Sequence, residues 1–417
     1  MLDEYAQLKK IFADTINALS TTQTFNVDLF FSQMEGAFKS AGFRESETNS
    51  AIKSILLLNI GAAGDFVLTT PAIRTVRENF PKAHITLIVN EKIFKLAELC
   101  PYVNEVLPVN QMQNVDYIKI FIDAANFSAA HLWKRRFDLA IFLGTVTNLF
   151  RNFLMYLSGA RERVSYFMNE LDKSLDTHYY RFSERYNDHD VIINLYLLKA
   201  HGLKIESTEI EVWFSGADLY TARQLLKNFG EGRIKVAVGI GTTDLARKYP
   251  VEKYLEAFKS LIDKGTALII FGGPSEVDDA KFLENNLPKE FVKNFVEVKA
   301  GWRVDVAAMS LTDIYIGNMT GACDVAAALK KPVICLSRVA RDFKKFFLNL
   351  NEAERYFPWK TDAIMLQPAH QLEECTKTPN FIGCKANRPH CIAQIKPSEI
   401  IDAFDKMTFK LREEMTR

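Results

Sequence analysis

The sequence predicts an α/β fold in which two doubly wound parallel sheets form two domains that face a cleft. The chain has 417 residues, of which 48% are hydrophobic, so it can bury more than one core. Short apolar runs rich in β-formers alternate with longer stretches of helical period, which is typical of βαβ units. This alternation begins twice, at Lys53 and near residue 234. The two series therefore predict two domains of similar design.

Composition and charge exclude several broad classes of function. The chain has 52 lysines and arginines against 51 aspartates and glutamates, a net charge of +1, so no overall field draws it to nucleic acid or to an acidic membrane. Its six cysteines are too few for a secreted disulfide framework. No stretch reaches about 18 uncharged apolar residues, and the amino terminus lacks the pattern of a signal peptide. We therefore expect a cytoplasmic protein, with at most a peripheral contact at the inner face of the cytoplasmic membrane.

The first half of the chain predicts a helical extension followed by a Rossmann-like domain. Residues 1–52 carry apolar residues at helical spacing and end in the turn-forming sequence ESETNS. This amphipathic extension is a candidate surface for self-association into a homo-oligomer. The first Rossmann-like domain is expected at 53–215. Its predicted strands are SILLLNI, HITLIVN, VNEVLPV, IFIDA and DLAIFLG.

The second half predicts another Rossmann-like domain, expected at 216–395. The stretch VEKYLEAFKSLIDKG has a helical period and stops at Gly265, as helices often do. The last segment, 396–417, predicts a helix that braces one half of the protein against the other. The predicted strands of this half are IKVAVGI, ALIIFGG, NFVEVK, DIYIGN and PVICLS.

The loop after the first predicted strand is a candidate binding site, because ligands of such sheets lie beyond the carboxyl ends of the strands. It contains Gly61 and Gly64, and a helix is expected to open near Asp65. Glycines let a backbone approach a ligand closely, and the N–H groups of a helix amino terminus bind anions. The spacing GxxGD differs from the pattern GxGxxG, so a dinucleotide cofactor is not expected. Taken alone, Asp65 is equally well explained as a helix cap.

Several motifs occur in one order along residues 53–405. The first half contains GxxGDxxLTTPAIR, FDLAIFLG, GARERVSYF and HDVIINLYLLKAHGL, and the second half contains VGIGTTDLARKYP, IIFGGPSE, TGACDVAAALKKPVICL and CIAQIKPSEIIDAF. Together these motifs resemble the bacterial heptosyltransferases of glycosyltransferase family nine. The resemblance implies the GT-B architecture of two facing Rossmann-like domains, the first holding the acceptor and the second the nucleotide sugar.

The resemblance also implies a reaction. Members of this family transfer heptose from ADP-heptose with inversion, without a required metal or other cofactor, onto the lipopolysaccharide inner core or, in one branch, onto protein. The family's catalytic base corresponds to Asp65, and a carboxylate suits this role because the acceptor hydroxyl must lose its proton. Thr242, Thr243 and Arg247 correspond to the residues that meet the diphosphate, where a cation offsets the charge on the leaving group. Glu276 corresponds to an acidic residue near the nucleoside ribose.

Some of these residues also have explanations without a functional role. Arg247 and Lys248 fit a solvated surface pair. Glu276 fits a glutamate in the first turn of a helix, where it stabilises the helix dipole. His189, which matches a frequent family histidine, fits a helix cap or simple packing.

The loop that follows DIYIGN differs most from the family. The family pattern is (S/N)DTGxxH, whose backbone N–H groups cradle the diphosphate, and Thr320, Gly321 and Ala322 retain the start of such a helix. Met319 stands in place of the aspartate and Asp324 in place of the histidine. A carboxylate beside a diphosphate weakens anion binding unless it is capped or paired with a cation.

These two replacements keep two alternatives open beside heptosyl transfer from ADP-heptose. One is a degenerate, non-catalytic GT-B protein that serves binding or assembly. The other is a GT-B transferase that uses a different nucleotide sugar. The opening GDxxLTTP argues against a third possibility, a sugar-nucleotide epimerase.

Two groups of basic residues allow more than one interpretation. Arg338, Arg341, Lys344 and Lys345 lie within eight residues. They fit a patch for a phosphorylated acceptor, a lipid surface or the donor diphosphate, and they also fit a solvated helix face. The group from Lys134 to Phe137 allows the same two interpretations.

Three cysteines near the end of the chain are candidate metal ligands: Cys375, Cys384 and Cys391. In the family that this chain resembles, one branch that glycosylates proteins binds iron through four cysteines. Here Thr378 stands where a further cysteine would complete a CxxC pair, which leaves His370 or His390 as the fourth ligand. With three thiols and no clear fourth ligand, we expect no bound metal.

Overall fold

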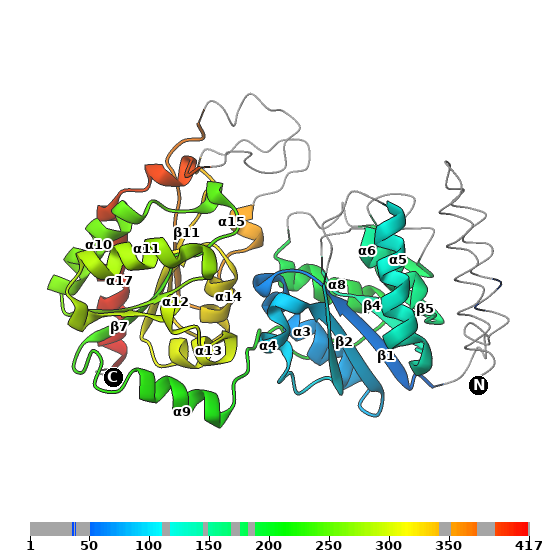
Figure 1. The fold of residues 1–417 in the computed structure, drawn as a ribbon. Helices are drawn as coiled ribbons and strands as arrows, with labels where there is room; N and C mark the ends of the chain where they lie inside the picture. Colours follow the sequence, from blue (N-terminus) through cyan, green and yellow to red (C-terminus); the bar gives the residue numbers. More distant parts are fainter. Residues whose placement is uncertain are drawn as a thin grey trace.

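The computed structural model describes residues 36, 38, 51–110, 117–144, 149–167, 176–181, 188–341, 352–372 and 388–415. These residues form two α/β domains that lie side by side (Figure 1). Each domain contains a six-stranded sheet in which all neighbouring strands are parallel. The predicted α/β class with two doubly wound parallel sheets is therefore confirmed.

The first sheet has the strand order β3-β2-β1-β4-β5-β6, which is the order of the Rossmann fold. Its central strands are buried on both faces because helices cover both sides of the sheet. Their sequences are therefore continuous apolar runs. The order reverses between β1 and β4, and the first candidate loop follows β1 at this reversal. The elements are β1 (Ser54–Asn59), α3 (Ala63–Asn79), β2 (His84–Asn90), η1 (Glu91–Ile93), α4 (Phe94–Ala97), β3 (Glu105–Val109), α5 (Tyr117–Phe127), the π-helical turn η2 (Ser128–Leu132), η3 (Trp133–Arg135), β4 (Leu139–Phe142), α6 (Leu149–Leu157), β5 (Glu162–Phe167), β6 (His178–Arg181) and α8 (Asp190–Ala200).

The second sheet repeats this design with the order β12-β11-β10-β7-β8-β9. The reversal now lies between β7 and β10, so the loops after these two strands meet at one edge. The predicted helix before Gly265 is present as α10, and Gly265 adopts a left-handed φ of 92°. The elements are α9 (Gly216–Leu225), β7 (Ile234–Gly239), η5 (Leu245–Arg247), α10 (Val251–Asp263), β8 (Thr266–Phe271), η6 (Pro274–Glu276), α11 (Val277–Asn286), η7 (Lys289–Phe291), β9 (Val292–Asn294), α12 (Phe295–Val298), α13 (Trp302–Ser310), β10 (Ile314–Asn318), α14 (Gly321–Ala328), β11 (Val333–Leu336), α15 (Glu352–Arg355), β12 (Ala363–Leu366), η8 (Cys391–Gln394) and α17 (Pro397–Met415).

One strand prediction is wrong, one overlaps its strand at a single residue, and three strands were not predicted. The run IFIDA lies within helix α5, where Phe121 and Ala124 are buried. A short apolar run fits a buried helix as well as a strand, so the pattern alone was ambiguous. In NFVEVK, Asn294 ends β9 and then caps α12 by accepting a hydrogen bond from the N–H of Glu297 at 3.4 Å. The strands missing from the prediction are β5, β6 and β12.

The predicted amino-terminal extension, 1–52, lies outside the described residues except at Gly36 and Phe38, which are both helical, and at Ala51 and Ile52, which precede β1. The ring of Phe38 is fully buried and meets the rings of Trp133 and Tyr156 edge-on, with centroids 6.3 and 6.0 Å away. This side chain therefore belongs to the core of the first domain, beside α6.

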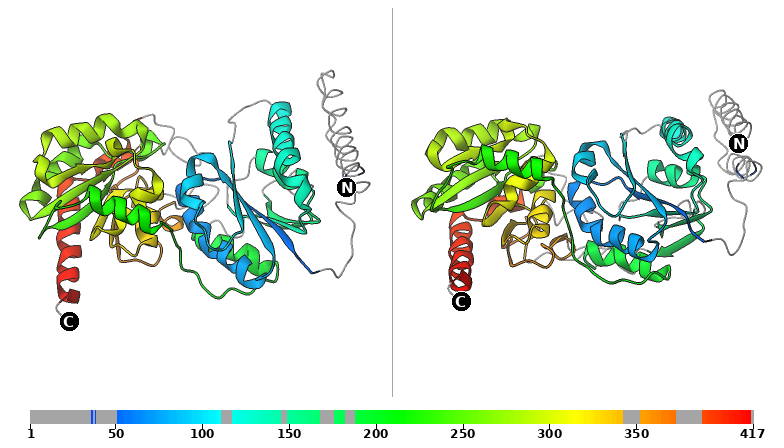
Figure 2. Two further views of the ribbon diagram at one scale, coloured as in Figure 1. Left: turned by 60° about the horizontal axis from the view of Figure 1, so that its bottom comes forward. Right: turned by 90° about the horizontal axis from the view of Figure 1, so that it is seen from below.

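The carboxy-terminal helix α17 belongs to the second domain. It packs against α10 and lies beside β11 and β12, and Figure 2 shows it away from the first domain. An ion pair between Lys264 and Asp405 joins it to the end of α10. For the described part of this helix, the prediction that it braces one half against the other is wrong, because its apolar face is used within one domain.

No helix within the described ranges is both long enough and apolar enough to cross a membrane.

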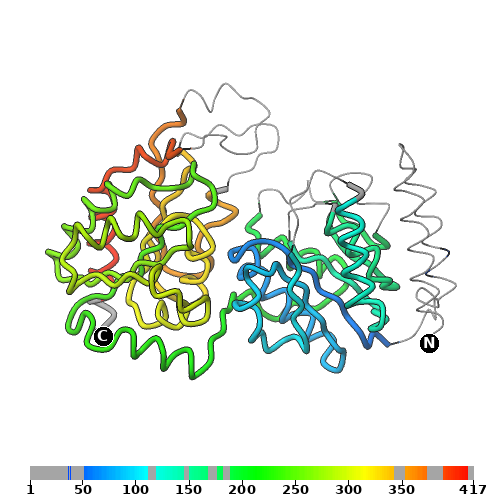
Figure 3. Tube along the Cα trace, in the orientation of Figure 1, coloured from blue at the N-terminus to red at the C-terminus, as the bar shows by residue number. Residues whose placement is uncertain are grey.

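The two domains are joined by apolar and polar contacts. One cluster of buried apolar side chains continues from α3 of the first domain to α14 of the second. At another edge, Trp302 donates to the carbonyl of Lys92 at 3.1 Å, and Arg303 pairs with Glu98 at 2.9 Å. Figure 3 follows the chain from α8 to α9, through an extended segment that crosses from one domain to the other. These contacts position the loops after β1, β7 and β10 around the junction of the domains.

Candidate active site

Asp65 lies in the first turn of α3, just beyond the carboxyl end of β1. Its Oδ2 accepts a hydrogen bond from the backbone N–H of Ala62 at 2.7 Å, so Asp65 does help to cap the helix. A Cβ atom at Gly61 would lie 2.6 Å from this Oδ2, which explains why glycine is needed there. Among the described residues, Oδ1 has no hydrogen-bond partner. Capping therefore uses one carboxylate oxygen and leaves the other available to a ligand.

Asn59, the buried last residue of β1, holds this turn in place. Its side-chain amide donates to the hydroxyl of Thr69 at 2.9 Å and to the carbonyl of Asp65 at 3.3 Å. The backbone of the first candidate loop is thus fixed by a buried polar side chain, and this limits how far the Asp65 carboxylate can move.

The electrostatic environment of Asp65 suits a base. Burial raises the pKa of its carboxyl above the ordinary value, although the N–H of Ala62 and the positive charges of Arg355 and Arg247 oppose this effect. A raised pKa makes the carboxylate a better proton acceptor than a free aspartate. Both arginines belong to the second domain, so the structure brings Asp65 and Arg247 within range of each other's charge.

The loops after β7 and β10 are held together by Asn318, the buried last residue of β10. Its amide donates to the carbonyl of Ile240 at 3.0 Å. Its side-chain oxygen accepts from the N–H of Tyr249 at 3.2 Å and from the hydroxyl of Tyr254 at 3.1 Å. The start of α14 and the Thr242–Arg247 loop are therefore parts of one rigid edge of the second sheet.

The first turns of α3 and α14 touch across the domain junction. A Cβ atom added at Gly64 would lie 3.2 Å from Cα of Gly321, and one added at Gly321 would lie 2.6 Å from the backbone nitrogen of Gly64. Only residues without a Cβ atom allow this approach. Both helices point their amino-terminal ends, which carry partial positive charge, toward the same region. Gly64, Gly321 and Asp65 are thereby brought together at the junction.

Asp324 and Met319 are both buried at this junction. The carboxylate of Asp324 faces Gly64, where an added Cβ atom would lie 2.5 Å from its Oδ2. Asp324 has no hydrogen-bond or ion-pair partner among the described residues. Burial, followed by the charges of Asp65 and Asp190, raises its pKa well above the ordinary value. A shift in this direction favours the protonated carboxyl, which can donate a hydrogen bond and does not repel a bound anion.

In the predicted diphosphate loop, Asp244 is the central residue. Its N–H donates to the hydroxyl of Thr242 at 3.1 Å, and its carboxylate lies 2.5 Å from Arg338 and 3.5 Å from Arg247. Thr243 is exposed. Arg338 is thus bound within the loop, whereas the sequence suggested either a ligand patch or a solvated face. The ion pair with Asp244 holds Arg247 where its charge acts on Asp65.

Glu276 is buried, and both of its carboxylate oxygens accept local hydrogen bonds. Oε2 accepts from the N–H of Gly273 at 2.8 Å, and Oε1 accepts from the hydroxyl of Ser275 at 2.7 Å. Glu276 therefore stabilises the turn at the start of its helix, as the explanation without a functional role requires. Its predicted contact with a ribose stays a prediction. Lys248, the neighbour of Arg247, pairs with Asp279 at 2.5 Å.

A buried ion pair beside the site was not predicted. Arg355 lies 2.5 Å from Asp190, with both side chains almost completely buried, and its charge acts on Asp65 as well. His189 caps α8 by accepting from the N–H of Val191 at 3.2 Å, while its other ring nitrogen donates to the carbonyl of Phe357 at 2.8 Å. Burial lowers the pKa of His189 to about 4, so it is neutral. Capping and packing therefore account for this histidine.

The remaining predicted groups lie partly outside the described residues. Cys375, Cys384, Lys344 and Lys345 are not among the described positions. Cys391 is buried, with its Sγ 3.5 Å from Nδ1 of His390. Within the described ranges, no three histidine, cysteine or carboxylate side chains are placed to hold a metal ion.

Comparison with known protein families identifies one match. The model of glycosyltransferase family 9 (heptosyltransferase) matches residues 131–345, which is more than half of the chain. No curated protein sequence matches.

Solved structures share the fold at low identity. A glycosyl transferase family 9 protein from Veillonella parvula has a TM-score of 0.68 and 19% identity, over 87% of this chain and 99% of its own. ADP-heptose LPS heptosyltransferase II from E. coli has a TM-score of 0.62 and 16% identity, over 86% of this chain and 99% of its own. Heptosyltransferase WaaC from E. coli, solved with ADP, has a TM-score of 0.58 and 16% identity, over 86% and 98%. These similarities support the two-domain GT-B fold.

Proposed function

The chain belongs to glycosyltransferase family 9, the heptosyltransferase family, and from this membership we propose that it transfers heptose from ADP-heptose, with inversion, to a saccharide or protein-linked acceptor. Two E. coli proteins that share its fold support the choice of donor, since one is named an ADP-heptose transferase and the other was solved with ADP. A sugar of the lipopolysaccharide core is the acceptor we favour, and a protein side chain is the alternative.

The observation that carries the proposal is the position of Asp65 at the junction of the two domains. In the proposed step, an acceptor hydroxyl attacks the anomeric carbon, the bond from that carbon to the diphosphate oxygen breaks, and Oδ1 of Asp65 takes the hydroxyl proton. The hydrogen bond from Ala62 fixes the other carboxylate oxygen, and the raised pKa of Asp65 increases its basicity. ADP then leaves with the bonding electrons.

The second domain supplies the stabilisation of the leaving group in this proposal. Arg247 offsets the charge that develops on the diphosphate, and the N–H groups of Gly321 and Ala322 at the start of α14 bind its oxygens. Thr242 and Thr243 line the same loop, and Glu276 is proposed near the ribose. No metal or other cofactor is needed for any of these steps.

A transferase for another nucleotide sugar is the second candidate. Met319 and Asp324 favour it, because they replace family residues in the loop that meets the diphosphate and thereby change the groups offered to the donor. Both candidates use the same base and the same reaction.

The proposal is tested by following ADP release from ADP-heptose, with lipopolysaccharide core saccharides as acceptors. Asp65→Asn keeps the shape of the side chain and removes its basicity, so we expect turnover to fall by about 100-fold or more, with ADP affinity unchanged. Asp263→Asn removes an exposed carboxylate at the end of α10 and is the matched control. Wild-type turnover in Asp65→Asn would refute the assignment of the base. Release of a different nucleotide from its sugar would favour the second candidate.

A further inference from the structure

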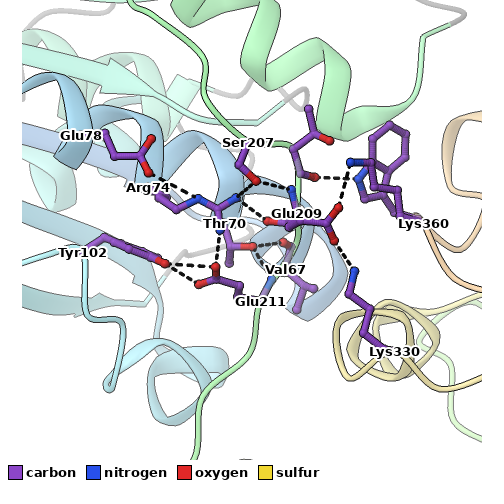
Figure 4. A network of polar contacts seen from close by, with 12 residues as sticks. Val67, Thr70, Arg74, Glu78, Tyr102, Ser207, Glu209, Glu211, Lys330 and Lys360 are labelled. Carbon is purple, nitrogen blue, oxygen red and sulfur yellow. Dashed lines mark hydrogen bonds and ion pairs between the residues drawn. The ribbon is translucent and has the colours of Figure 1, made fainter.

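The segment that joins the two domains, residues 203–215, is fixed to α3 of the first domain by Arg74. The guanidinium of Arg74 donates to the hydroxyl of Ser207 and to the backbone carbonyl of Glu209, both at 2.9 Å. It also pairs with the carboxylate of Glu211. Figure 4 shows these contacts converging on one side chain that lies nearly buried on α3. We call residues 203–215 the linker.

The second domain holds the same linker through Glu209. The carboxylate of Glu209 accepts from the ammonium groups of Lys330 and Lys360, the latter at 2.8 Å (Figure 4). Beside it, the indole of Trp359 donates to the carbonyl of Thr208 at 2.7 Å. Glu209 therefore contacts the first domain through its main chain and the second domain through its side chain. We call Arg74, Glu209, Lys330 and Lys360 the linker clasp.

The backbone of both lysines is unusual. Lys330 and Lys360 have left-handed φ values of 57° and 50°. This conformation is unfavourable for a residue with a Cβ atom, and lysine is not among the residues that tolerate it best. The two ammonium groups hold the pKa of Glu209 below its usual value, so its carboxylate is charged at neutral pH. Two strained turns thus direct positive charge to one carboxylate on the linker.

The linker clasp acts on the two helices that meet at the candidate active site. The helices α3 and α14 touch at their first turns, where Gly64 meets Gly321. Arg74 lies ten residues beyond Gly64 and Lys330 lies nine residues beyond Gly321, so at 1.5 Å per residue the clasp acts about 14 Å from this contact. Two helices joined at two places this far apart cannot rotate against each other unless one of the joints opens.

We infer that Glu209 is a positioning residue, whose carboxylate holds the second domain in the orientation at which the Thr320–Gly321 loop faces Asp65. The effect on turnover rests on the proposed function, whereas the effect on orientation does not. The ion pairs of Glu209 are partly exposed, and such pairs are individually weak and screened by salt. The linker clasp therefore opens when charge is removed or salt is raised, and the joint between α3 and α14 then loosens.

Amide hydrogen exchange of the full-length protein tests this orientation directly. In Glu209→Gln we expect peptides covering the first turns of α3 and α14 to exchange at least threefold faster than in the wild type. Salt at 0.5 M, roughly three times physiological ionic strength, is expected to speed exchange in the wild type and to have little further effect in Glu209→Gln. The matched control is Glu206→Gln, because Glu206 lies on the same linker and pairs with Lys204, also on the linker, at 2.5 Å. We expect exchange in this control to equal that of the wild type.

Steady-state kinetics with ADP-heptose separate positioning from a general loss of structure. All proposed donor contacts lie in the second domain, so Glu209→Gln is expected to lower kcat at least threefold and to leave donor KM and ADP affinity unchanged. Glu209→Asp keeps the charge and is expected to recover part of kcat. Exchange in Glu209→Gln equal to that in Glu206→Gln would overturn the inference, and so would faster exchange with unchanged kcat. Faster exchange in a protein that does not use ADP-heptose would instead overturn the proposed donor and leave the effect of Glu209 on orientation supported.

Discussion

The contact between Gly64 and Gly321 predicts that a single methyl group added at Gly321 will push the first turns of α3 and α14 apart. In Gly321→Ala, the new Cβ atom would lie 2.6 Å from the backbone nitrogen of Gly64 and 3.0 Å from Cβ of Ala63. Ordinary van der Waals contact begins at 3.4 Å, so the first turns of α3 and α14 must part by about 0.8 Å. The obstacle is backbone rather than the end of a flexible side chain, so a rotamer change does not relieve it.

The expected cost follows from overpacking and from misalignment. Overpacking a close contact costs about 1–3 kcal/mol, which urea unfolding measures as a lower free energy of unfolding. Moving reacting groups by about 1 Å lowers turnover by about 100-fold. Gly216→Ala is the matched control, since Gly216 is also the first residue of a helix and a Cβ atom there meets nothing within 4 Å. The control is expected to be neutral or to stabilise by up to about 1 kcal/mol. Equal stability and equal turnover in the two variants would refute the close approach of the helices.

Three further predictions concern buried charges near the junction. Burial raises the pKa of Asp305 to about 7, and its Oδ1 has no hydrogen-bond partner among the described residues. Because the folded-state pKa exceeds that of the unfolded chain, the wild type should lose stability as pH rises from 4 through 7, whereas Asp305→Asn should not. Urea unfolding of the wild type at pH 5 and at pH 8 should therefore show a difference of at most about 3 kcal/mol. Arg355→Met leaves Asp190 buried without this cation and should lower the free energy of unfolding, measured in urea, by about 3–5 kcal/mol. The double variant Arg355→Met with Asp190→Asn should recover part of this lost stability. The pKa of Asp324, like that of Asp305, is raised. Asp324→Asn should therefore raise Tm at pH 8 and have little effect at pH 4. A lower Tm of this variant at pH 8 would show instead that the carboxylate of Asp324 is paired.

Much of the fold could be predicted because a buried parallel strand leaves a clear local pattern. Strands such as HITLIVN are covered on both faces, so the chain must supply a continuous apolar run, and the run is visible in the sequence. The same reasoning failed at IFIDA, because an apolar run within a buried helix looks similar. It also missed β6, an edge strand whose sequence HYYR is polar and largely exposed.

The part of the candidate site that is formed by neighbouring residues could also be predicted, whereas the part that is formed by distant residues could not. Gly61, Gly64 and Asp65 lie within five residues, so one loop motif locates them together. The pair of Asp190 with Arg355 joins positions 165 residues apart, and neither residue belongs to a motif that would connect them. The linker clasp is similar, because its members come from four separate segments. Such pairs depend on how the domains are placed against each other, which a pattern along the chain does not specify.

The most direct test of the account is thermal stabilisation of the wild type and of Asp65→Asn by ADP, UDP, GDP and CMP. A nucleotide present at 100 times its Kd adds about 2.7 kcal/mol to the free energy of unfolding, which is large enough to resolve as a shift in Tm. The account predicts that ADP alone raises Tm, and that it does so equally in both proteins because the base does not contact the nucleotide. Stabilisation by a different nucleotide would contradict the donor. No stabilisation by any of the four would contradict the transferase itself and favour a degenerate protein that serves binding or assembly.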